Sequence, residues 1–271
     1  QFSPSPQRFD WSNRVEMADC WVREGYRGSG LADDLLRRAA QHAREDGCAD
    51  LTLTVGTENQ RALGYFESRG FEPQGYGMVV PLAAVSLGGE AGVADGPQFR
   101  RVRSDEDTMC WFVDECWLPF WRDMGEAAGE AHLSPTLDRE ELVDSLVDAY
   151  DTPDRRCWVA LDEADDATRP LEETDAVCAG WINAGREPTD PFLASQDRLF
   201  IGNLYTDPDY RGTGLTDRLV ERARQYAREE GCDEFSLGVE DGNDRAMAYY
   251  DKLGFERFEQ RMAVPVDSLA L

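Results

Sequence analysis

Residues 210–215 read Tyr-Arg-Gly-Thr-Gly-Leu, and residues 26–31 read Tyr-Arg-Gly-Ser-Gly-Leu. A shift of 184 residues, from position 26 to position 210, superimposes the two stretches and continues downstream without a gap. The downstream matches include the run Asn-x-Arg-Ala, at 59–62 and again at 243–246. Agreement over this length indicates an internal duplication, which determines the architecture of the chain.

Each copy predicts the order strand, Gly-rich turn, helix, strand, helix, strand. In the second copy the apolar residues of 215–227 follow a 3.6-residue period, which predicts an amphipathic helix ended by Gly231. Residues 235–239 alternate between apolar and small residues, as strands do, and residues 258–266 predict a final strand. Asn243 is placed to cap the helix between these two strands.

The two copies differ in what precedes them. The stretch before the second copy predicts strands at 99–102, 157–161 and 176–182, and helices at 105–120 and 137–150. The first copy has room only for its own strand at 15–22, so we expect it to be incomplete at its N-terminal side. These patterns predict an α/β (α+β) chain with a partial unit at 1–85, a Gly- and Ala-rich linker at 86–97 and a complete domain at 98–271.

The chain is strongly acidic. It has 54 acidic and 28 basic residues, a formal net charge of -26, and Lys252 is its single lysine. This charge argues against nucleic acid as a partner, because phosphate binding requires positive charge. The absence of any long apolar run predicts that no segment spans a membrane. The composition resembles that of proteins from extremely halophilic archaea, although an acidic surface can also steer a cationic substrate.

The cysteine and histidine content limits which kinds of site the chain can carry. Seven cysteines without a Cys-x-x-Cys pair fit a cytoplasmic protein better than a disulfide-stapled secreted one. With only His42 and His132 in the chain, we expect neither a metal site nor a His-based catalytic triad.

The repeated Arg-Gly-x-Gly turn lies between a predicted strand and a predicted helix, where a phosphate can be held. Glycine lets the backbone approach an anion, successive N–H groups point at it, and the helix dipole favours its charge. Arg27 or Arg211 could add a charge-assisted contact. The turn has neither the GK[ST] of a P-loop nor the G-x-G-x-x-G of a dinucleotide fold.

Two signatures give a family resemblance. The segment 201–255 resembles the core of the GNAT acetyltransferase superfamily, whose first signature is [RQ]-x-x-G-x-[GA]. Residues 27–32 match it fully, and residues 211–216 depart from it only at Thr216. The second signature, N-x-x-A-x-x-x-Y-x-x-x-G-F, is complete at 243–255, whereas the first copy has Phe66 in place of the Tyr. The resemblance implies a tandem fold in which a central mixed sheet with a splayed strand pair is flanked by helices.

The resemblance also implies roles in binding acetyl-CoA. The Gly-rich turn binds the pyrophosphate, the backbone at the end of the preceding strand and an Asn bind the pantetheine arm, and Tyr250 protonates the leaving thiolate. The implied cofactor-binding residues are Leu204, Tyr205, Thr206, Arg211, Gly212, Thr213, Gly214, Leu215, Thr216 and Asn243 in the second copy, and Arg27, Gly28, Ser29, Gly30, Leu31, Ala32 and Asn59 in the first. The extra bulk of Thr216 predicts weaker pyrophosphate binding.

The acid–base groups are only partly assigned. A Tyr hydroxyl with a pKa near 10 is protonated at neutral pH and can donate, whereas Phe66 cannot, and neighbouring Tyr65 points about 100° away on a helix. Many family members carry an acid on the strand before the turn, where this chain has Gly202 and Asn203. The base therefore stays open between water and an acid elsewhere, such as Asp207 or Glu240, while the first copy has Asp19 at the position of Asn203.

The acceptor is less constrained. In the family, the region 105–150 forms part of the acceptor cleft. Its aromatic residues suit a helical core stripe, and some of them could line that cleft; they are Trp111, Trp117, Phe120 and Trp121.

We therefore expect an N-acetyltransferase that transfers an acetyl group from acetyl-CoA to a primary amine of a small molecule or peptide, by direct attack in the second domain. The first copy is then an architectural or cofactor-holding partner. The alternative is a non-catalytic acyl-CoA sensor or assembly module, which the missing strand acid and Thr216 favour. A further interpretation is a homodimer in which the first copy pairs with another chain.

Overall fold

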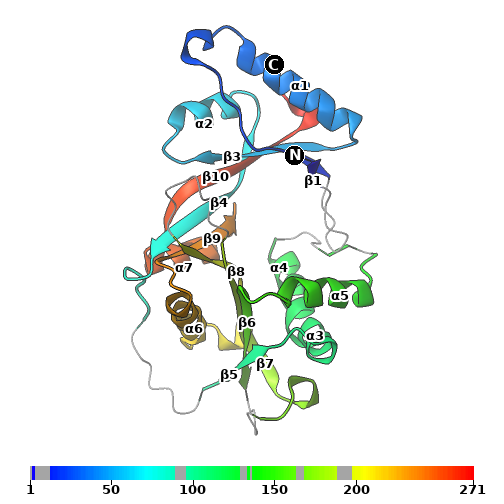
Figure 1. Cartoon of the computed structure of the whole chain (residues 1–271), viewed down its shortest axis with the longest axis vertical. Coiled ribbons are helices and arrows are strands. Elements are labelled where there is room, and N and C mark those ends of the chain that lie inside the picture. The colour runs from blue at the N-terminus through cyan, green and yellow to red at the C-terminus, as the bar shows by residue number, and fades with distance from the viewer. Residues whose placement is uncertain are drawn as a thin grey trace. The chain divides into compact units, whose positions relative to one another are not determined.

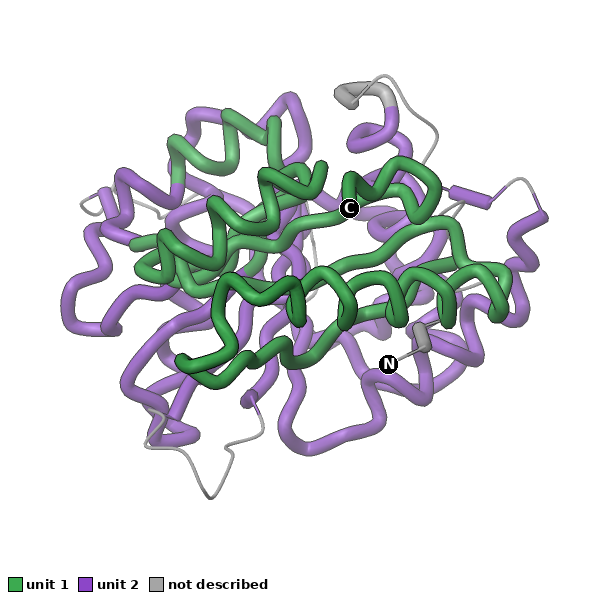
Figure 2. Tube along the Cα trace, turned by 90° about the horizontal axis from the view of Figure 1, so that it is seen from above, with its two compact units in different colours: residues 1–78, 238–249, 256–271 green, residues 79–237, 250–255 purple. Residues whose placement is uncertain are grey.

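The structure is a computed structural model of the chain (Figure 1), and it describes residues 2–3, 13–88, 96–128, 133–134, 136–162, 168–187 and 197–271. The chain divides into two compact units, which Figure 2 colours separately. Unit 1 comprises residues 1–78, 238–249 and 256–271, and unit 2 comprises residues 79–237 and 250–255. Much of the predicted linker, residues 89–95, lies outside the described residues, and the predicted domain boundaries stay predictions.

Unit 1 is built on a mixed sheet. Its strands lie in the order β1-β2-β3-β10-β4, with β2 parallel to β3 and β10 antiparallel to β3. The elements that lie wholly or partly in unit 1 are β1 (Phe2–Ser3), β2 (Arg14–Met17), the 3-10 turn Glu24–Tyr26, α1 (Leu31–Glu45), β3 (Asp50–Gly56), α2 (Gln60–Glu67), β4 (Glu72–Pro81), β9 (Glu234–Glu240), α7 (Asp244–Leu253), β10 (Glu256–Pro265) and the 3-10 turn Val266–Ser268.

The last strand of the chain completes the core of unit 1. β10 pairs with β3 from Glu259↔Gly56 to Pro265↔Asp50. Its inward side chains Met262 and Val264 are fully buried in one apolar cluster with side chains from α1, β3 and α2. In the sequence repeat β10 belongs to the second copy, so a strand of the second copy closes the core of the first.

Unit 2 also contains a mixed sheet, in the order β9-β8-β7-β6-β5. Only the β8–β9 pair is parallel; the pairs among β5, β6, β7 and β8 are antiparallel. The elements first met in unit 2 are β5 (Gln98–Val102), α3 (Glu106–Phe112), the π-helical turn Val113–Trp117, α4 (Leu118–Ala128), α5 (Arg139–Tyr150), β6 (Arg155–Asp162), the 3-10 turn Leu171–Glu173, β7 (Val177–Arg186), β8 (Arg198–Thr206), the 3-10 turn Pro208–Tyr210 and α6 (Leu215–Glu229).

Helices cover both faces of the unit 2 sheet. α3, α4 and α5 lie on one side of strands β5 to β8, and α6 lies on the other (Figure 1). Trp181 on β7 meets Phe112 of α3 and Phe120 of α4, at centroid distances of 5.1 and 5.4 Å, which fixes these helices on the sheet. The predicted fold class, a mixed α/β sheet flanked by helices, is confirmed. None of the helices within the described ranges is both long and apolar enough to cross a lipid bilayer.

The duplication is visible in the backbone. The turn glycines Gly28 and Gly30 have φ angles of 78° and 88°, and their counterparts Gly212 and Gly214 have 80° and 86°. The glycines that end the helices agree as closely, with 68° at Gly47 against 71° at Gly231, and 89° at Gly70 against 93° at Gly254. The two copies therefore share local conformation at the positions where they share sequence.

Two equivalent strands nevertheless differ in length. The alignment predicts a strand at 15–22 in the first copy, but β2 ends at Met17, whereas β8 continues to Thr206. The parallel pairing to the next strand stops at equivalent places, at Met17↔Leu53 in unit 1 and at Ile201↔Leu237 in unit 2. The prediction for residues 18–22 was therefore wrong.

The reason is the neighbour on the other edge. β7 pairs with β8 as far as Gly180↔Thr206, so the last residues of β8 keep a hydrogen-bonding partner. Within the described part of unit 1, β1 pairs with β2 only at Phe2↔Val15 and Ser3↔Arg14. Backbone amide and carbonyl groups without a partner strand turn to solvent, and the strand ends.

Closure of unit 1 by β10 gives a first prediction. Replacing Met262, which is 0 % exposed, by Ala should lower the free energy of unfolding by about 2–5 kcal/mol, because burial is lost and a cavity remains. Urea denaturation of the full chain measures the change. Leu271→Ala is the control, since Leu271 is 44 % exposed and should contribute less than about 0.5 kcal/mol. A loss below about 1 kcal/mol for Met262→Ala would contradict the assigned role of β10.

Candidate functional site

The Gly-rich turn 211–216 joins the end of β8 to the start of α6. Gly212 and Gly214 have left-handed φ angles, and a Cβ on either would meet no atom within 4 Å. Glycine is therefore required there by backbone conformation and not by crowding. Gly214 is the N-cap of α6 and has no side chain to accept the first-turn N–H groups. These N–H groups and the dipole of a 15-residue helix face an open space suited to an anion.

Side chains brace this turn from both sides. The Arg211 Nε donates to the Thr206 carbonyl at 3.2 Å, and its guanidinium forms an ion pair with Asp123 of α4 at 2.7 Å. Thr216, the departure from the family signature, shares a hydrogen bond of 2.9 Å with the Thr206 hydroxyl. The hydroxyl of Thr213 donates to the Tyr210 carbonyl at 2.7 Å. The Arg211 side chain thus points into the protein, and Thr216 ties α6 to the end of β8.

A β-bulge interrupts β8 just before its last residues. The pairing passes from Asn183↔Asn203 to Ala184↔Ile201, so Gly202 is the extra residue. The Asn183 amide fills the bulge: its Oδ1 accepts the Asn203 N–H at 2.9 Å, and its Nδ2 donates to the Tyr150 hydroxyl at 2.6 Å. A Cβ at Gly202 would overlap with Asn183 Oδ1. Sequence reasoning missed this network, although a lone Gly within a strand signals a bulge.

The predicted thioester-binding residues, Leu204, Tyr205 and Thr206, follow the bulge. They pair with Ile182, Trp181 and Gly180 of β7, beyond the stretch in which β8 pairs with β9. The Tyr205 ring packs on Phe120 of α4 at 5.4 Å and is buried. Burial, and then the negative charges of Asp123 and Asp207, raise the pKa of Tyr205 to about 12. The structure thus brings residues 204–206 and 211–216 together around one strand end.

An aromatic cluster lies over this strand end, on α4 and the π-helical turn before it. Trp117, Phe120 and Trp121 contact one another, with centroid distances of 5.7 Å for Trp117–Trp121 and 4.9 Å for Phe120–Trp121. Trp117 and Phe120 are buried, as a core stripe predicts, whereas Trp111 and Trp121 are half-buried. The cluster thus combines core packing with a partly exposed tryptophan.

The acids nominated as bases have local partners. Asp207 caps the 3-10 turn after β8 by accepting the Asp209 N–H at 3.0 Å. Glu240 lies in unit 1, where it is 3.6 Å from the Arg261 guanidinium and 65 % exposed. Asp19 of the first copy is exposed and lies outside a strand. Unit 2 also brings Asp123 of α4 to the end of β8, which sequence reasoning missed because 54 acids offer no local signal.

The second signature folds as two helix caps and a buried ring. Asn243 Oδ1 accepts the Ala246 N–H at 3.1 Å, as Asn59 does for Ala62 at 3.2 Å. Both caps lie in unit 1, whereas Tyr250 lies in unit 2.

Tyr250 is buried against Phe255, at a centroid distance of 5.3 Å. Phe66 and Phe71 of the first copy form the same edge-to-face pair at 5.3 Å, so the ring serves packing in both copies. Burial raises the pKa of Tyr250 above its ordinary value, and its hydroxyl is therefore protonated at neutral pH.

The turn of the first copy, residues 27–32, has the same backbone arrangement as the turn 211–216 but different contacts with the rest of the protein. The Arg27 Nε donates to the Val22 carbonyl at 3.2 Å, as Arg211 does to Thr206. No ion pair to Arg27 occurs among the described residues, whereas Arg211 has Asp123. Leu31 is 38 % exposed, while its counterpart Leu215 is buried.

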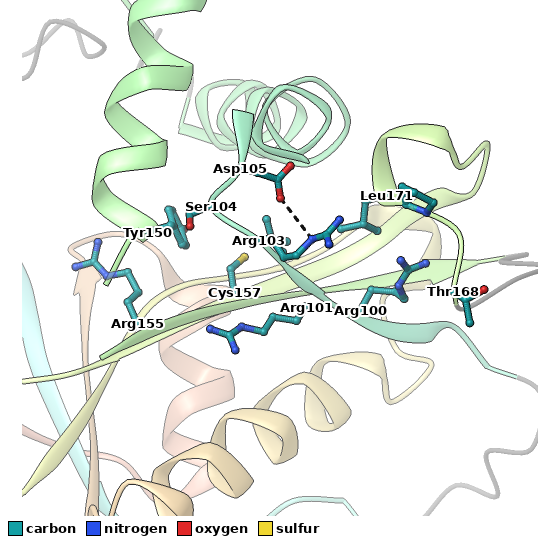
Figure 3. A pocket seen from close by; sticks show the side chains of 12 residues that line it. Arg100, Arg101, Arg103, Ser104, Asp105, Tyr150, Arg155, Cys157, Thr168 and Leu171 are labelled. Carbon is teal, nitrogen blue, oxygen red and sulfur yellow. Dashed lines mark ion pairs between the residues drawn. The ribbon is translucent and has the colours of Figure 1, made fainter. Parts of the chain in front are cut away.

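A separate pocket of about 740 Å³ opens beside β5 (Figure 3). Arginines from β5, from the segment after it and from the start of β6 line it, and Arg103 pairs with Asp105 at 3.4 Å. None of the predicted cofactor-binding residues lines this pocket.

Comparison with known proteins identifies relatives. The profile of the acetyltransferase (GNAT) family matches residues 2–71 and 121–255. A stretch of 56 residues is 34% identical to thialysine N-epsilon-acetyltransferase of Bos taurus, and covers 21% of this chain and 33% of that protein. A stretch of 71 residues is 37% identical to N-alpha-acetyltransferase 30 of Saccharomyces cerevisiae, and covers 26% and 40%, respectively. The chain thus matches a third to two-fifths of the length of these relatives.

Two solved structures share the fold over nearly the whole chain. A tandem GNAT protein from the clavulanic acid biosynthesis pathway has a TM-score of 0.57 and 14% identity, and the match covers 93% of this chain and 75% of that one. A GCN5-related N-acetyltransferase from Sphaerobacter thermophilus has a TM-score of 0.58 and 14% identity, covering 98% and 75%. At this identity the likeness shows the fold alone.

The bulge gives a second prediction. Gly202→Ala should destabilise the chain by about 1–3 kcal/mol, because the added methyl group displaces the Asn183 amide. Gly238→Ala is the matched control, since a Cβ on this strand glycine meets nothing within 4 Å and its effect should be neutral or slightly stabilising. Chemical denaturation of both variants measures the difference. Equal stabilities would show that Asn183 does not occupy the bulge.

Proposed function

Because the chain belongs to the acetyltransferase (GNAT) family, we propose that it transfers an acetyl group from acetyl-CoA to a primary amine, with the chemistry in the second repeat. The observation that carries the proposal is the strand end where residues 204–206, the turn 211–216 and the uncapped start of α6 come together. The acceptor is a small molecule or a peptide. The cysteine usage supports a cytoplasmic protein, and the acidic composition supports one that works in high salt without a nucleic acid partner.

The turn fits the pyrophosphate of acetyl-CoA. The left-handed glycines leave open space beside the first-turn N–H groups of α6, and a diphosphate suits both their hydrogen bonds and the helix dipole. Gly212, Thr213 and Gly214 would hold it through backbone groups, with Leu215 and Thr216 in the first turn. Arg211 braces the turn through Thr206. The same arrangement at 27–32 makes the first copy a candidate second cofactor site.

The reaction needs a neutral amine, a stabilised oxyanion and a proton for sulfur. The ammonium loses one proton to water, its nitrogen attacks the thioester carbonyl, the C–S bond breaks, and nitrogen loses its second proton. Backbone N–H groups around 204–206 would stabilise the oxyanion, which in a dry site contributes several kcal/mol. Tyr250 would donate its hydroxyl proton to the thiolate.

Burial acts on Tyr250 in two ways. It keeps the hydroxyl protonated, but it also makes the hydroxyl a weaker acid than the free side chain. A thiol has an ordinary pKa of about 8.5, so hydrogen-bond donation to the departing sulfur accounts for more of its effect than complete proton transfer.

A non-catalytic acyl-CoA sensor is the second candidate. The bulge residues Gly202 and Asn203 cannot act as bases, and the Tyr250 ring packs as its non-reactive counterpart Phe66 does. A homodimer completed through the first copy stays a proposal, which the mass in solution tests.

Thiol release from acetyl-CoA separates the two candidates. In molar salt, a panel of primary amines should stimulate release, and the acetylated amine should appear in equal amount. Binding of acetyl-CoA without turnover on any amine would favour the sensor.

Tyr250→Phe tests the proposed donor. Turnover should fall about 100-fold, at the lower end of general acid catalysis, while the Kd for acetyl-CoA changes less than about twofold. Tyr226→Phe is the control, because Tyr226 is also a buried tyrosine and burial raises its pKa as well. Unchanged turnover in Tyr250→Phe would remove Tyr250 from the mechanism.

A further inference from the structure

The Arg211–Asp123 ion pair joins two parts of the proposed site. Arg211 belongs to the turn after β8, and Asp123 belongs to α4, which covers the end of that strand. The carboxylate and the guanidinium are only 26% and 32% exposed. A pair this well shielded is less screened by salt than a surface pair, so it retains influence in a saline medium.

Asp123 lies where an acceptor would meet the thioester. One helical turn before it, Phe120 packs on Tyr205, within the predicted thioester-binding segment. The negative charge of Asp123 is also close enough to raise the pKa of Tyr205.

The ion pair with Arg211 leaves some of the hydrogen-bond acceptor sites of the Asp123 carboxylate available. The Arg211 guanidinium contacts Asp123 Oδ2 at 2.7 Å, and a carboxylate has about four lone-pair sites. A carboxylate binds an ammonium group through charge and charge-assisted hydrogen bonds.

We propose that Asp123 binds the ammonium group of the acceptor, so that the substrate is an amine that arrives as a cation. This inference rests on the proposed function and names the substrate class of the same site. A diphosphate held by the turn draws Arg211 toward itself and leaves more of the Asp123 charge to the amine. Cofactor and acceptor therefore bind with positive coupling, each raising the affinity of the other.

The repeat supports this assignment by contrast. In the first copy Arg27 makes the same bond to the strand-end carbonyl, and the described residues supply it with no acid. The brace of the turn therefore does not require a carboxylate. The carboxylate is added only where α4 covers the strand end, which is where an acceptor would enter.

Asp123→Asn tests the proposal by separating two KM values. The KM for an alkylamine, which is cationic at neutral pH, should rise at least tenfold, while the KM for acetyl-CoA stays within twofold or falls. An arylamine, which is neutral at that pH, should be affected less than twofold. If Asp123 only braced the turn, the KM for acetyl-CoA would rise instead, and this result would overturn the proposal.

Asp114→Asn is the matched control. Asp114 lies on the preceding π-helical turn and is also paired with an arginine, Arg139, at 2.6 Å, but its side chain is 45% exposed. This variant should leave both KM values unchanged.

Two further outcomes separate the inference from its premise. Wild-type turnover with every KM unchanged in Asp123→Asn would overturn the inference alone. Acetyl-CoA binding without turnover on any amine would overturn the proposed function, and the inference with it.

If Asp123→Asn lowers the yield of folded chain, a second experiment replaces the kinetic test of this variant. Calorimetry then measures acetyl-CoA binding to the wild-type chain with and without the alkylamine. Tighter binding in the presence of the amine is expected, and equal binding would overturn the coupling.

Discussion

The antiparallel pairing of β7 with β8 is the interaction on which the candidate site depends. β8 leaves its parallel partner β9 after Ile201, and the five residues that follow stay extended because β7 continues to Gly180↔Thr206. The bulge at Gly202 is set within this stretch and is filled by Asn183, a residue of β7 itself. The turn 211–216, the start of α6 and the Arg211–Asp123 ion pair to α4 all lie at or just after the end of β8, which its pairing with β7 keeps extended. Without this neighbour the strand would stop where its counterpart β2 stops.

The two copies show what that neighbour changes. Their turns have the same φ angles and the same arginine-to-carbonyl bond, so local sequence is sufficient to form the conformation of this loop. What differs is the environment of the loop. In unit 2 the turn gains the Thr206–Thr216 hydrogen bond and the Arg211–Asp123 pair, and Leu215 is buried, whereas Leu31 is exposed. The proposed phosphate binding therefore depends on the repeat itself, and the proposed acceptor binding depends on the helices and strands placed before the second repeat.

Sequence reasoning succeeded where a feature depends on neighbours in the chain. The Gly-rich turn between strand and helix, the Asn243 cap and the amphipathic α6 follow from residues within one or two turns, and these were predicted. It failed where a feature depends on a distant partner. The early end of β2 reflects how short its pairing with β1 is among the described residues. The Asn183 network spans β7, β8 and α5, and Asp123 is one acid among 54 until α4 brings it to Arg211. The interpretation of Thr216 changed for the same reason, because its hydroxyl has a partner on β8.

The placement of β10 links the duplication to the chemistry. The first repeat cannot complete its core until the last strand of the chain has formed, because Met262 and Val264 supply its buried face. Pairing over such a sequence separation costs loop-closure entropy and folds slowly, so unit 1 should be the late step. The same strand begins next to the signature helix: the Phe255 N–H donates to the Tyr250 carbonyl at 3.0 Å, and β10 starts at the following residue. Helix α7, which carries the proposed donor Tyr250, thus ends where β10 begins, and β10 is the strand that completes the core of the first repeat. The two repeats therefore depend on each other to fold, although the sequence presents them as two separate units.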